Sequence, residues 1–212
     1  MEQPVKIRDV AKRAIRGQIS SAALARFKSQ GYQDTTVDQI AADVGMSTRT
    51  FFRYFPSKDD VLLEASYLFG DRFLTNLKSG LSSNDLWRAL GDALEKSVEQ
   101  CRLPGLDERD REVQALIRIT PSLLARQLEA MEKVQIEAVA LCLKESPQAS
   151  KLTAGTVHAI VGSAFACYQA SVHYAARQHK EIEVGSDLQT IVQSLRPRIL
   201  DEEIPHEAAT SF

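Results

Sequence analysis

The sequence predicts an all-α protein of about nine helices, with a small N-terminal domain and a larger helical body. Apolar residues recur every three or four positions along most of the 212 residues, and the alternating pattern of strands is almost absent. Capping and helix-breaking residues divide this pattern into segments of helical length. Basic charge gathers at one end: residues 1–58 hold 10 Lys+Arg and 5 Asp+Glu, whereas the rest of the chain is acidic overall.

The first helix is expected over residues 9–30, which carry a stripe of apolar residues at helical spacing. Gly31 should end it, because glycine tolerates the positive φ common after a helix. Basic residues accompany this helix and the segment before it, among them Lys6, Arg8 and Arg16. A basic domain on an otherwise acidic chain favours contact with nucleic acid.

Two short helices joined by a tight turn are expected next. Thr36 and Gln39 have the spacing of a capping box at the start of the first helix. Gly45 can end it, and Ser47 can cap a second helix that runs to residue 54 or 55. This is the pattern of a helix-turn-helix, whose second helix enters the major groove of DNA. Two ordinary core helices around a glycine turn are the alternative reading.

A third helix should begin after Pro56, with Ser57 and Asp60 at capping-box spacing. Lys58 lies in its first turn, where a lysine offers its own charge and nearby free backbone amides to a phosphate. We therefore expect Lys58 to contact the DNA backbone. Lys6 and Arg8 are expected to form an arm that reaches an adjacent groove or the backbone.

The segment SAALARFKSQGYQDTTVDQIAADVGMSTRTFFRYFPSKDDVLL resembles the DNA-binding domain of TetR-family transcriptional regulators. The resemblance covers about residues 10–65. It implies a ligand-responsive regulator, most often a repressor, that binds a palindromic operator as a dimer and is released by a small effector. Phe52 departs from the family, which often has Tyr there. A hydrogen bond from that hydroxyl is therefore lost, while stacking against sugar or a thymine methyl group remains open.

Phosphate contacts position a protein on DNA, whereas contacts with base edges select the site. Arg49 is the best candidate for bidentate reading of a guanine, and Arg53 suits either purpose. Each of these charges, taken alone, also fits a plain solvated helix face. The expected DNA contacts are Lys6, Arg8, Thr36, Ser47, Thr48, Arg49, Thr50, Phe52, Arg53, Tyr54 and Lys58.

The chain is expected to divide into a DNA-binding domain at 1–58, an effector-binding and dimerisation domain at 59–200, and a flexible tail at 201–212. Thr120-Pro121 should open a long helix, because proline suits the first helical position. The other helices of the body are expected over 57–79, after Ser83, after Asp107, from Thr153 to about Arg177, and after a box formed by Ser186 with Gln189.

The last two helices predict self-association. Small residues along one side of the helix from Thr153 let a second helix approach closely, and two such pairs can form a four-helix bundle across a two-fold axis. A buried helix within a monomer is the alternative. The expected dimer interface comprises Ala159, Gly162, Ala166, Ala170, Leu188, Ile191, Val192 and Leu195.

An effector cavity inside the body is implied by the family resemblance. The segment ITPSLLARQLEAMEKVQIEAVALCL also resembles the subgroup whose effector domains bind acyl-CoA-like ligands. Aromatic residues and methionine at helical spacing are more often plain core than the lining of a pocket. The candidate pocket residues, apolar with a few polar groups, are Phe73, Trp87, Leu116, Ile119, Met131, Phe165, Tyr168, Gln169 and His173.

Other classes of protein find little support. The four histidines lack the spacing of metal ligands, and no nucleophile elbow, phosphate loop or glycine fingerprint occurs, so we expect neither an enzyme nor a metal or cofactor site. No apolar run long enough for a membrane span and no signal peptide is found, which favours the cytoplasm. The three cysteines are expected to be free, buried or partly buried thiols. A DNA-binding architectural protein without an effector remains the alternative function.

Overall fold

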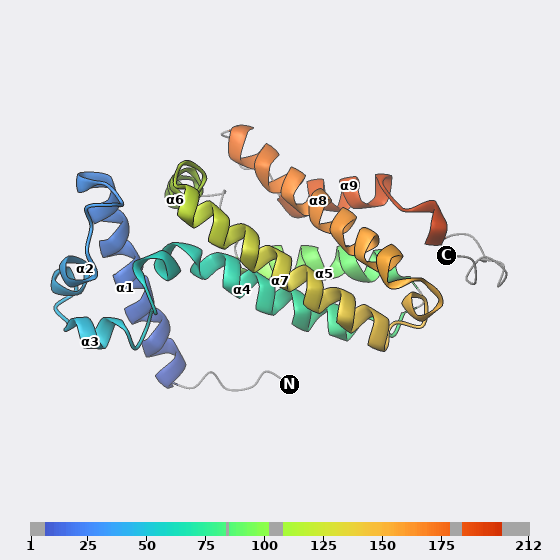
Figure 1. Ribbon diagram of the computed structural model, residues 1–212, viewed down its shortest axis with the longest axis horizontal. Coiled ribbons are helices and arrows are strands. Elements are labelled where there is room, and N and C mark those ends of the chain that lie inside the picture. Colours follow the sequence, from blue (N-terminus) through green and yellow to red (C-terminus); the bar gives the residue numbers. More distant parts are fainter. Residues whose placement is uncertain (1–6, 84, 102–107, 179–183, 201–212) are drawn as a thin grey trace. The chain divides into compact units, whose positions relative to one another are not determined.

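The computed structural model describes residues 7–83, 85–101, 108–178 and 184–200. These residues form helices and loops, with no strand among them (Figure 1). The chain divides into two compact units, Met1–Glu64 and Ala65–Phe212. The all-α fold and the helix-turn-helix at its N-terminal end are confirmed.

The first unit holds α1 (Ile7–Gln30), α2 (Val37–Asp43), α3 (Thr48–Phe51) and the start of α4 (Lys58–Gly80). Its core is built from the apolar stripe of α1 and from residues of the two short helices. Because α2 and α3 are too short to be stable alone, their position depends on this packing. The fully buried side chains among its described residues are Ile19, Ala23, Ile40, Phe51, Phe55 and Leu63.

Local sequence sets the boundaries of these elements. The Thr36 hydroxyl accepts a hydrogen bond from Gln39 N, and Thr36 N donates one to Gln39 Oε1, which completes the predicted capping box. Gly31 and Gly45 both have positive φ, 89° and 72°, as expected where glycine ends a helix. The expected length of the second helix was wrong: α3 ends at Phe51, and the chain continues through turns to Phe55.

The second unit contains the rest of α4, α5 (Leu86–Cys101), α6 (Glu108–Ile119), α7 (Pro121–Glu145), α8 (Ala154–Gln178) and α9 (Val184–Ser194). Short 3₁₀ turns occur at Ala149–Lys151 and Arg198–Leu200. Helix α8 packs against α5, α7 and α9, and Figure 1 shows its long diagonal course over α7. The apolar faces of these helices close a continuous core.

Several predicted starts of helices are corrected by the structure. Asp85, rather than Ser83, caps α5, since its Oδ1 accepts a hydrogen bond from Arg88 N at 2.9 Å. Thr120 precedes Pro121 as expected, but its side chain makes no capping bond. Thr153 does cap α8, through Thr156 N at 3.1 Å. Ser186 lies inside α9, which begins two residues earlier, so the predicted box does not start that helix.

The cysteines are free, as expected: Cys101 is partly buried, and Cys142 and Cys167 are buried. Burial raises the pKa of the Cys142 thiol to about 12, which keeps it protonated at neutral pH. None of the described helices is long and apolar enough to cross a membrane. Nor do His, Cys, Asp or Glu side chains gather as a metal site within the described part of the chain.

Candidate nucleic-acid interface

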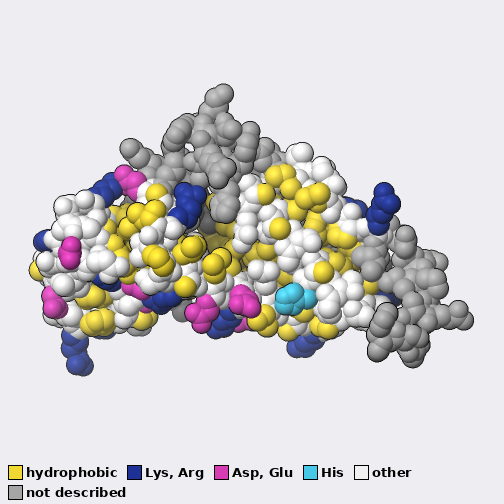
Figure 2. Space-filling view, turned by 45° about the horizontal axis from the view of Figure 1, so that its top comes forward, with side chains coloured by type: hydrophobic (Ala, Val, Ile, Leu, Met, Phe, Trp, Pro, Cys, Tyr) yellow, Lys and Arg dark blue, Asp and Glu magenta, His cyan; other side chains and the backbone are white. Residues whose placement is uncertain are grey.

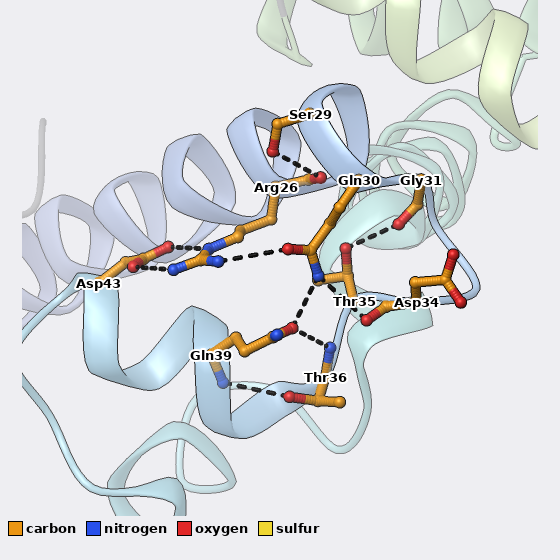
Figure 3. A network of polar contacts seen from close by, with 9 residues as sticks. All are labelled: Arg26, Ser29, Gln30, Gly31, Asp34, Thr35, Thr36, Gln39 and Asp43. Atoms are coloured by element: carbon orange, nitrogen blue, oxygen red, sulfur yellow. Dashed lines mark hydrogen bonds and ion pairs between the residues drawn. The ribbon is translucent and has the colours of Figure 1, made fainter.

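A polar network fastens α2 to the C-terminal half of α1 (Figure 3). Arg26 donates two hydrogen bonds to Asp43, at 2.6 and 2.7 Å. Gln30 joins α1 to the start of α2, because its Nε2 donates to Gln39 Oε1 at 2.8 Å and to Asp34 O at 3.0 Å. The Arg26 guanidinium holds the pKa of Asp43 below its ordinary value. Arg26 therefore positions α2, although its charge belongs to the basic set seen in the sequence.

Helix α3 is anchored from beneath by aromatic residues and at its start by a hydroxyl. Phe51 and Phe55 are fully buried, with ring centroids 6.0 Å apart. Ser47 accepts a hydrogen bond from Thr50 N at 3.2 Å, so it caps α3 as predicted. The Thr48 hydroxyl donates to Asp38 on α2, which links the two helices of the motif. The sequence did not identify this link, because Asp38 and Thr48 lie in different elements.

Arg16 supports the same element from α1. Its guanidinium lies 4.1 Å from the centre of the Phe55 ring and donates to Tyr54 O at 2.6 Å. It also forms an ion pair with Glu64. A cation stacked on an aromatic ring and hydrogen-bonded twice is held in place. Arg16 thus belongs to the scaffold behind the turn that follows α3, and it is not available to DNA as a free charge.

Three neighbouring side chains on and after α3 remain exposed: Arg49, Phe52 and Arg53. Neither arginine makes a hydrogen bond or an ion pair with any residue that the structure describes. Phe52 is 52% exposed, with its ring edge-on to Phe51 at 5.7 Å. An exposed aromatic ring and two unpaired guanidinium groups thus occur within five residues of the chain. This cluster is the most conspicuous candidate for contact with a partner.

Lys58 lies in the first turn of α4, as predicted, but its ammonium group makes contacts within the chain. Its ammonium group donates to the carbonyl oxygens of Tyr32, Gln33 and Thr35, at 2.7, 3.3 and 2.8 Å. It also lies 4.4 Å from the centre of the Tyr32 ring. An ammonium has three N–H donors, and all three have acceptors here. The charge assigned to a phosphate from the sequence is therefore engaged within the chain.

Of the remaining predicted DNA contacts, some lie among the described residues and others do not. Thr36 is exposed at the start of α2, while Thr50 and Tyr54 are partly buried. Lys6 lies outside the described residues, and the side chain of Arg8 is not described either. The predicted arm therefore stays a prediction.

The predicted pocket residues of the body are mostly packed against one another. Phe73 meets Phe165 edge-on at 4.9 Å, and both are buried. Tyr168 is stacked on Phe69 at 4.4 Å, and its hydroxyl makes no hydrogen bond among the described residues. Burial, with a smaller contribution from Cys101, raises the pKa of that hydroxyl. A buried hydroxyl without a partner is uncommon in a packed protein.

The other pocket candidates are dispersed. Trp87 is buried and donates from Nε1 to Val192 O at 2.7 Å, so it joins α5 to α9. Ile119 is 78% exposed on the surface of α6, which contradicts its predicted place in an interior. Leu116, Met131 and Gln169 are partly buried, and the side chain of His173 lies outside the described residues.

Fewer of the predicted dimer-interface residues are exposed than expected. Leu188 and Val192 are buried within the chain itself, because α9 turns them toward the core of the body. Ala159, Ala166 and Ala170 are exposed along α8, and Leu195 is 59% exposed at the end of α9. Figure 2 shows apolar and uncharged side chains over much of the described surface of the body on this face.

A groove of about 410 Å³ lies between α5 and α9, which the sequence did not predict. Trp87, Gly91, Val192, Asp85 and Arg196 are among the residues that line it. Arg196 donates to both carboxylate oxygens of Asp85 at 2.9 Å. Because the walls are mostly charged and paired, the groove has little of the apolar character of an effector site.

The fold and this site define a helix-turn-helix protein with a separate helical body. Residues 19–65 match the family of "Bacterial regulatory proteins, tetR family", and the chain belongs to that family. Two curated relatives are similar in part. HTH-type transcriptional regulator TcmR of Streptomyces glaucescens is 34% identical over 127 residues, which cover 58% of this chain and 56% of TcmR. HbdR of Aromatoleum sp. (strain CIB) is 49% identical over 47 residues, which cover 22% of this chain and 20% of HbdR.

The match thus spans little more than half the length of TcmR and a fifth of HbdR. Two solved structures share the fold over most of both chains. The fatty acid degradation regulator FadR of Bacillus halodurans has a TM-score of 0.56 at 17% identity, covering 96% of this chain and 98% of its own. SmeT, the repressor of the Stenotrophomonas maltophilia multidrug efflux pump SmeDEF, has a TM-score of 0.53 at 17% identity, covering 84% and 87%.

Proposed function

We propose that this protein is a ligand-responsive transcriptional regulator, a repressor that binds a palindromic operator as a dimer and is released by a small apolar effector. The observation that carries the proposal is the cluster of Arg49, Phe52 and Arg53. These residues are exposed together on and after α3, whereas Arg16 and Arg26 of the same unit are paired with Glu64 and Asp43. A surface built in this way retains its unpaired charges for a partner.

The chemistry of the cluster suits duplex DNA. A guanidinium group can donate two parallel hydrogen bonds to guanine O6 and N7, and Arg49 is on the short helix that would enter the groove. Arg53, one turn further on, has the reach for a phosphate or a second base. The Phe52 ring has no hydrogen bond to offer, so its part is apolar contact with a sugar or a thymine methyl group.

A dimer follows from the length of DNA to be read. Two helix-turn-helix units read half-sites about 34 Å apart, one turn of the double helix. The exposed alanines of α8 and the exposed Leu195 support a two-fold contact between bodies, since small residues let helices approach closely. Loss of the dimer would remove one half-site and most of the affinity.

The effector is argued from Tyr168 and its surroundings. The rings of Phe69 and Phe165 pack against the Tyr168 ring, and Phe73 packs against Phe165, while the buried Tyr168 hydroxyl has no partner among the described residues. A ligand with an apolar body and one hydrogen-bonding group would satisfy both features. Such a ligand shifts the protein away from the DNA-binding conformation only by as much as its affinity for the two conformations differs.

The first experiment selects DNA. Genomic fragments retained by the full-length chain should share a palindrome, and the enriched fragment then serves as the operator. Arg49→Ala should relax base preference, because a lost bidentate contact costs about 1–3 kcal/mol of discrimination. Thr75→Ala, an exposed change in the body, is the matched control. Retention of random DNA without a preferred sequence would favour an architectural protein and defeat the proposal.

The second experiment tests the effector. Acyl-CoAs and neutral apolar compounds are screened for a rise in the melting temperature and for release of the operator fragment. Tyr168→Phe removes only the hydroxyl. An effector that bonds to this group should bind the variant about tenfold more weakly, equivalent to about 1.4 kcal/mol. Equal binding by both proteins would show that the hydroxyl is not the anchor, and no response to any compound would remove the effector from the proposal.

A further inference from the structure

We propose that Lys58 is a positioning residue, which sets the DNA-reading helix through the loop before α2 and does not itself bind a phosphate. The inference rests on the proposed function, and it reverses the role that the sequence alone suggests for this lysine. The term Lys58 clasp is used for the ammonium group of Lys58 with the carbonyl oxygens of Tyr32, Gln33 and Thr35.

The clasp joins segments that are far apart in the chain. Lys58 is the first residue of α4, and its three acceptors lie in the loop between α1 and α2. The Tyr32 ring lies 4.4 Å from the ammonium nitrogen, and its hydroxyl donates to Asp59. Two successive residues of α4 therefore hold this loop. Lys58 binds the backbone of the loop, and Asp59 binds the side chain of Tyr32.

Side chains other than Lys58 also contact the loop, among them Gln30, whose Nε2 donates to Asp34 O at 3.0 Å. Thr35 is 1% exposed, and its hydroxyl donates to Gly31 O at 2.7 Å. Three carbonyl oxygens that converge on one point repel one another, because each carries a partial negative charge. A cation placed between them removes this repulsion. An ammonium group meets this need, as it is compact and its three donors rotate freely. The planar guanidinium of arginine cannot direct its donors in the same manner.

A continuous path of contacts leads from the clasp to α3. Thr35, held by the clasp, directly precedes Thr36, which caps α2. Asp38 in the first turn of α2 accepts the hydroxyl of Thr48, the first residue of α3. A shift of the loop is therefore passed to the start of α2 and from there to the element that carries Arg49.

Two variants separate positioning from phosphate binding. Lys58→Met removes the charge and keeps the length of the side chain, whereas Lys58→Arg keeps the charge and changes its geometry. Arg53→Met serves as the control, because Arg53 is exposed and unpaired among the described residues of the same unit. All are measured in the full-length chain well below its melting temperature, so that every variant remains folded.

Three readings are taken from each variant: the salt dependence of affinity for the operator fragment, the ratio of operator to random-DNA affinity, and amide exchange across residues 31–36. We expect both Lys58 variants to lower the affinity ratio about tenfold or more. Exchange should become faster across 31–36, and the salt slope should stay at the wild-type value. Arg53→Met should reduce that slope by about 0.9, as one lost phosphate contact does.

The inference is overturned if Lys58→Met reduces the salt slope like the control while Lys58→Arg binds as the wild type. It is also overturned if the melting temperature falls but the affinity ratio and the exchange across 31–36 do not change. A wild-type chain without sequence preference would defeat the proposed function instead. The exchange measurement, which needs no DNA, would still decide whether Lys58 holds the loop.

Discussion

Gly70 on α4 offers a sharp test of the packing in the body. A Cβ atom added at this position would lie 2.6 Å from Val134 Cγ2 on α7, closer than real side chains approach. The branched valine is stiff, so it cannot rotate away without leaving its preferred rotamer. We therefore expect Gly70→Ala to force the two helices apart or to strain both side chains.

Two opposing terms set the size of the effect. Alanine in place of glycine within a helix gains about 1 kcal/mol of helix propensity. Overpacking a well-filled contact costs about 1–3 kcal/mol. The net change is therefore a destabilisation of roughly 0–2 kcal/mol. Val134→Ala removes the clashing atom and leaves only Val134 Cβ, 3.8 Å from the added carbon, at ordinary contact distance.

A double-mutant cycle isolates the clash. In the Val134→Ala background, Gly70→Ala should stabilise the protein by about 1 kcal/mol, the propensity gain alone. Gly17→Ala is the control, since no atom lies within 4 Å of a Cβ added there. Melting followed by circular dichroism at fixed protein concentration measures the two single variants, the double variant and the Gly17→Ala control, and Trp87 fluorescence follows the body. If Gly70→Ala raised stability in the wild-type background as much as Gly17→Ala does, the close contact of α4 with α7 would be refuted.

Further changes test other parts of the structure. Trp87→Phe removes the indole hydrogen bond to Val192 O; because that carbonyl also accepts a longer backbone bond, melting should reveal a loss of only about 1–2 kcal/mol. Arg26 lowers the pKa of Asp43, so their ion pair stabilises the first unit at pH values above the ordinary Asp pKa. This stabilisation is lost as the pH falls through the pKa of Asp43 in the folded protein. Melting curves from about pH 6 to pH 2 should therefore show less acid sensitivity in Arg26→Gln than in the wild type. Phe52→Ala should weaken operator binding while Phe52→Tyr preserves it, measured by mobility shift; equal binding by all three would exclude a contact by the ring.

The sequence predicted the helix-turn-helix well because the residues that set its helix boundaries are close together in the chain. A capping box at Thr36, a positive φ at Gly45 and a cap at Ser47 each depend on residues within one turn. The end of α3 was misjudged because neither Phe52 nor Arg53 breaks a helix by itself, whereas in the structure the chain turns after Phe51 and buries Phe55 completely. Tertiary contacts set boundaries that propensity leaves open.

Charge roles were harder to predict than helices. Composition gives the same weight to every basic residue of the first unit, but the structure separates those that are paired within the chain from those that are not. Arg16, Arg26 and Lys58 hold the scaffold through Glu64, Asp43 and backbone carbonyls, acceptors that are 17 to 48 residues away. No pattern within a short window identifies such partners. Sequence alone thus does not separate the charges that hold the scaffold from those that stay exposed.

The effector region shows the same limit from the opposite side. An apolar stripe on a helix looks the same whether it fills a core or lines a cavity, because both need one apolar face. Phe73 and Phe165 meet edge-on and satisfy each other, so they need no ligand to explain them. Tyr168 differs only in its hydroxyl, which is buried without a partner among the described residues. The sequence does not show that this hydroxyl lacks a hydrogen-bond partner. Because of this polar group, Tyr168 is a better test of effector chemistry than the apolar residues around it.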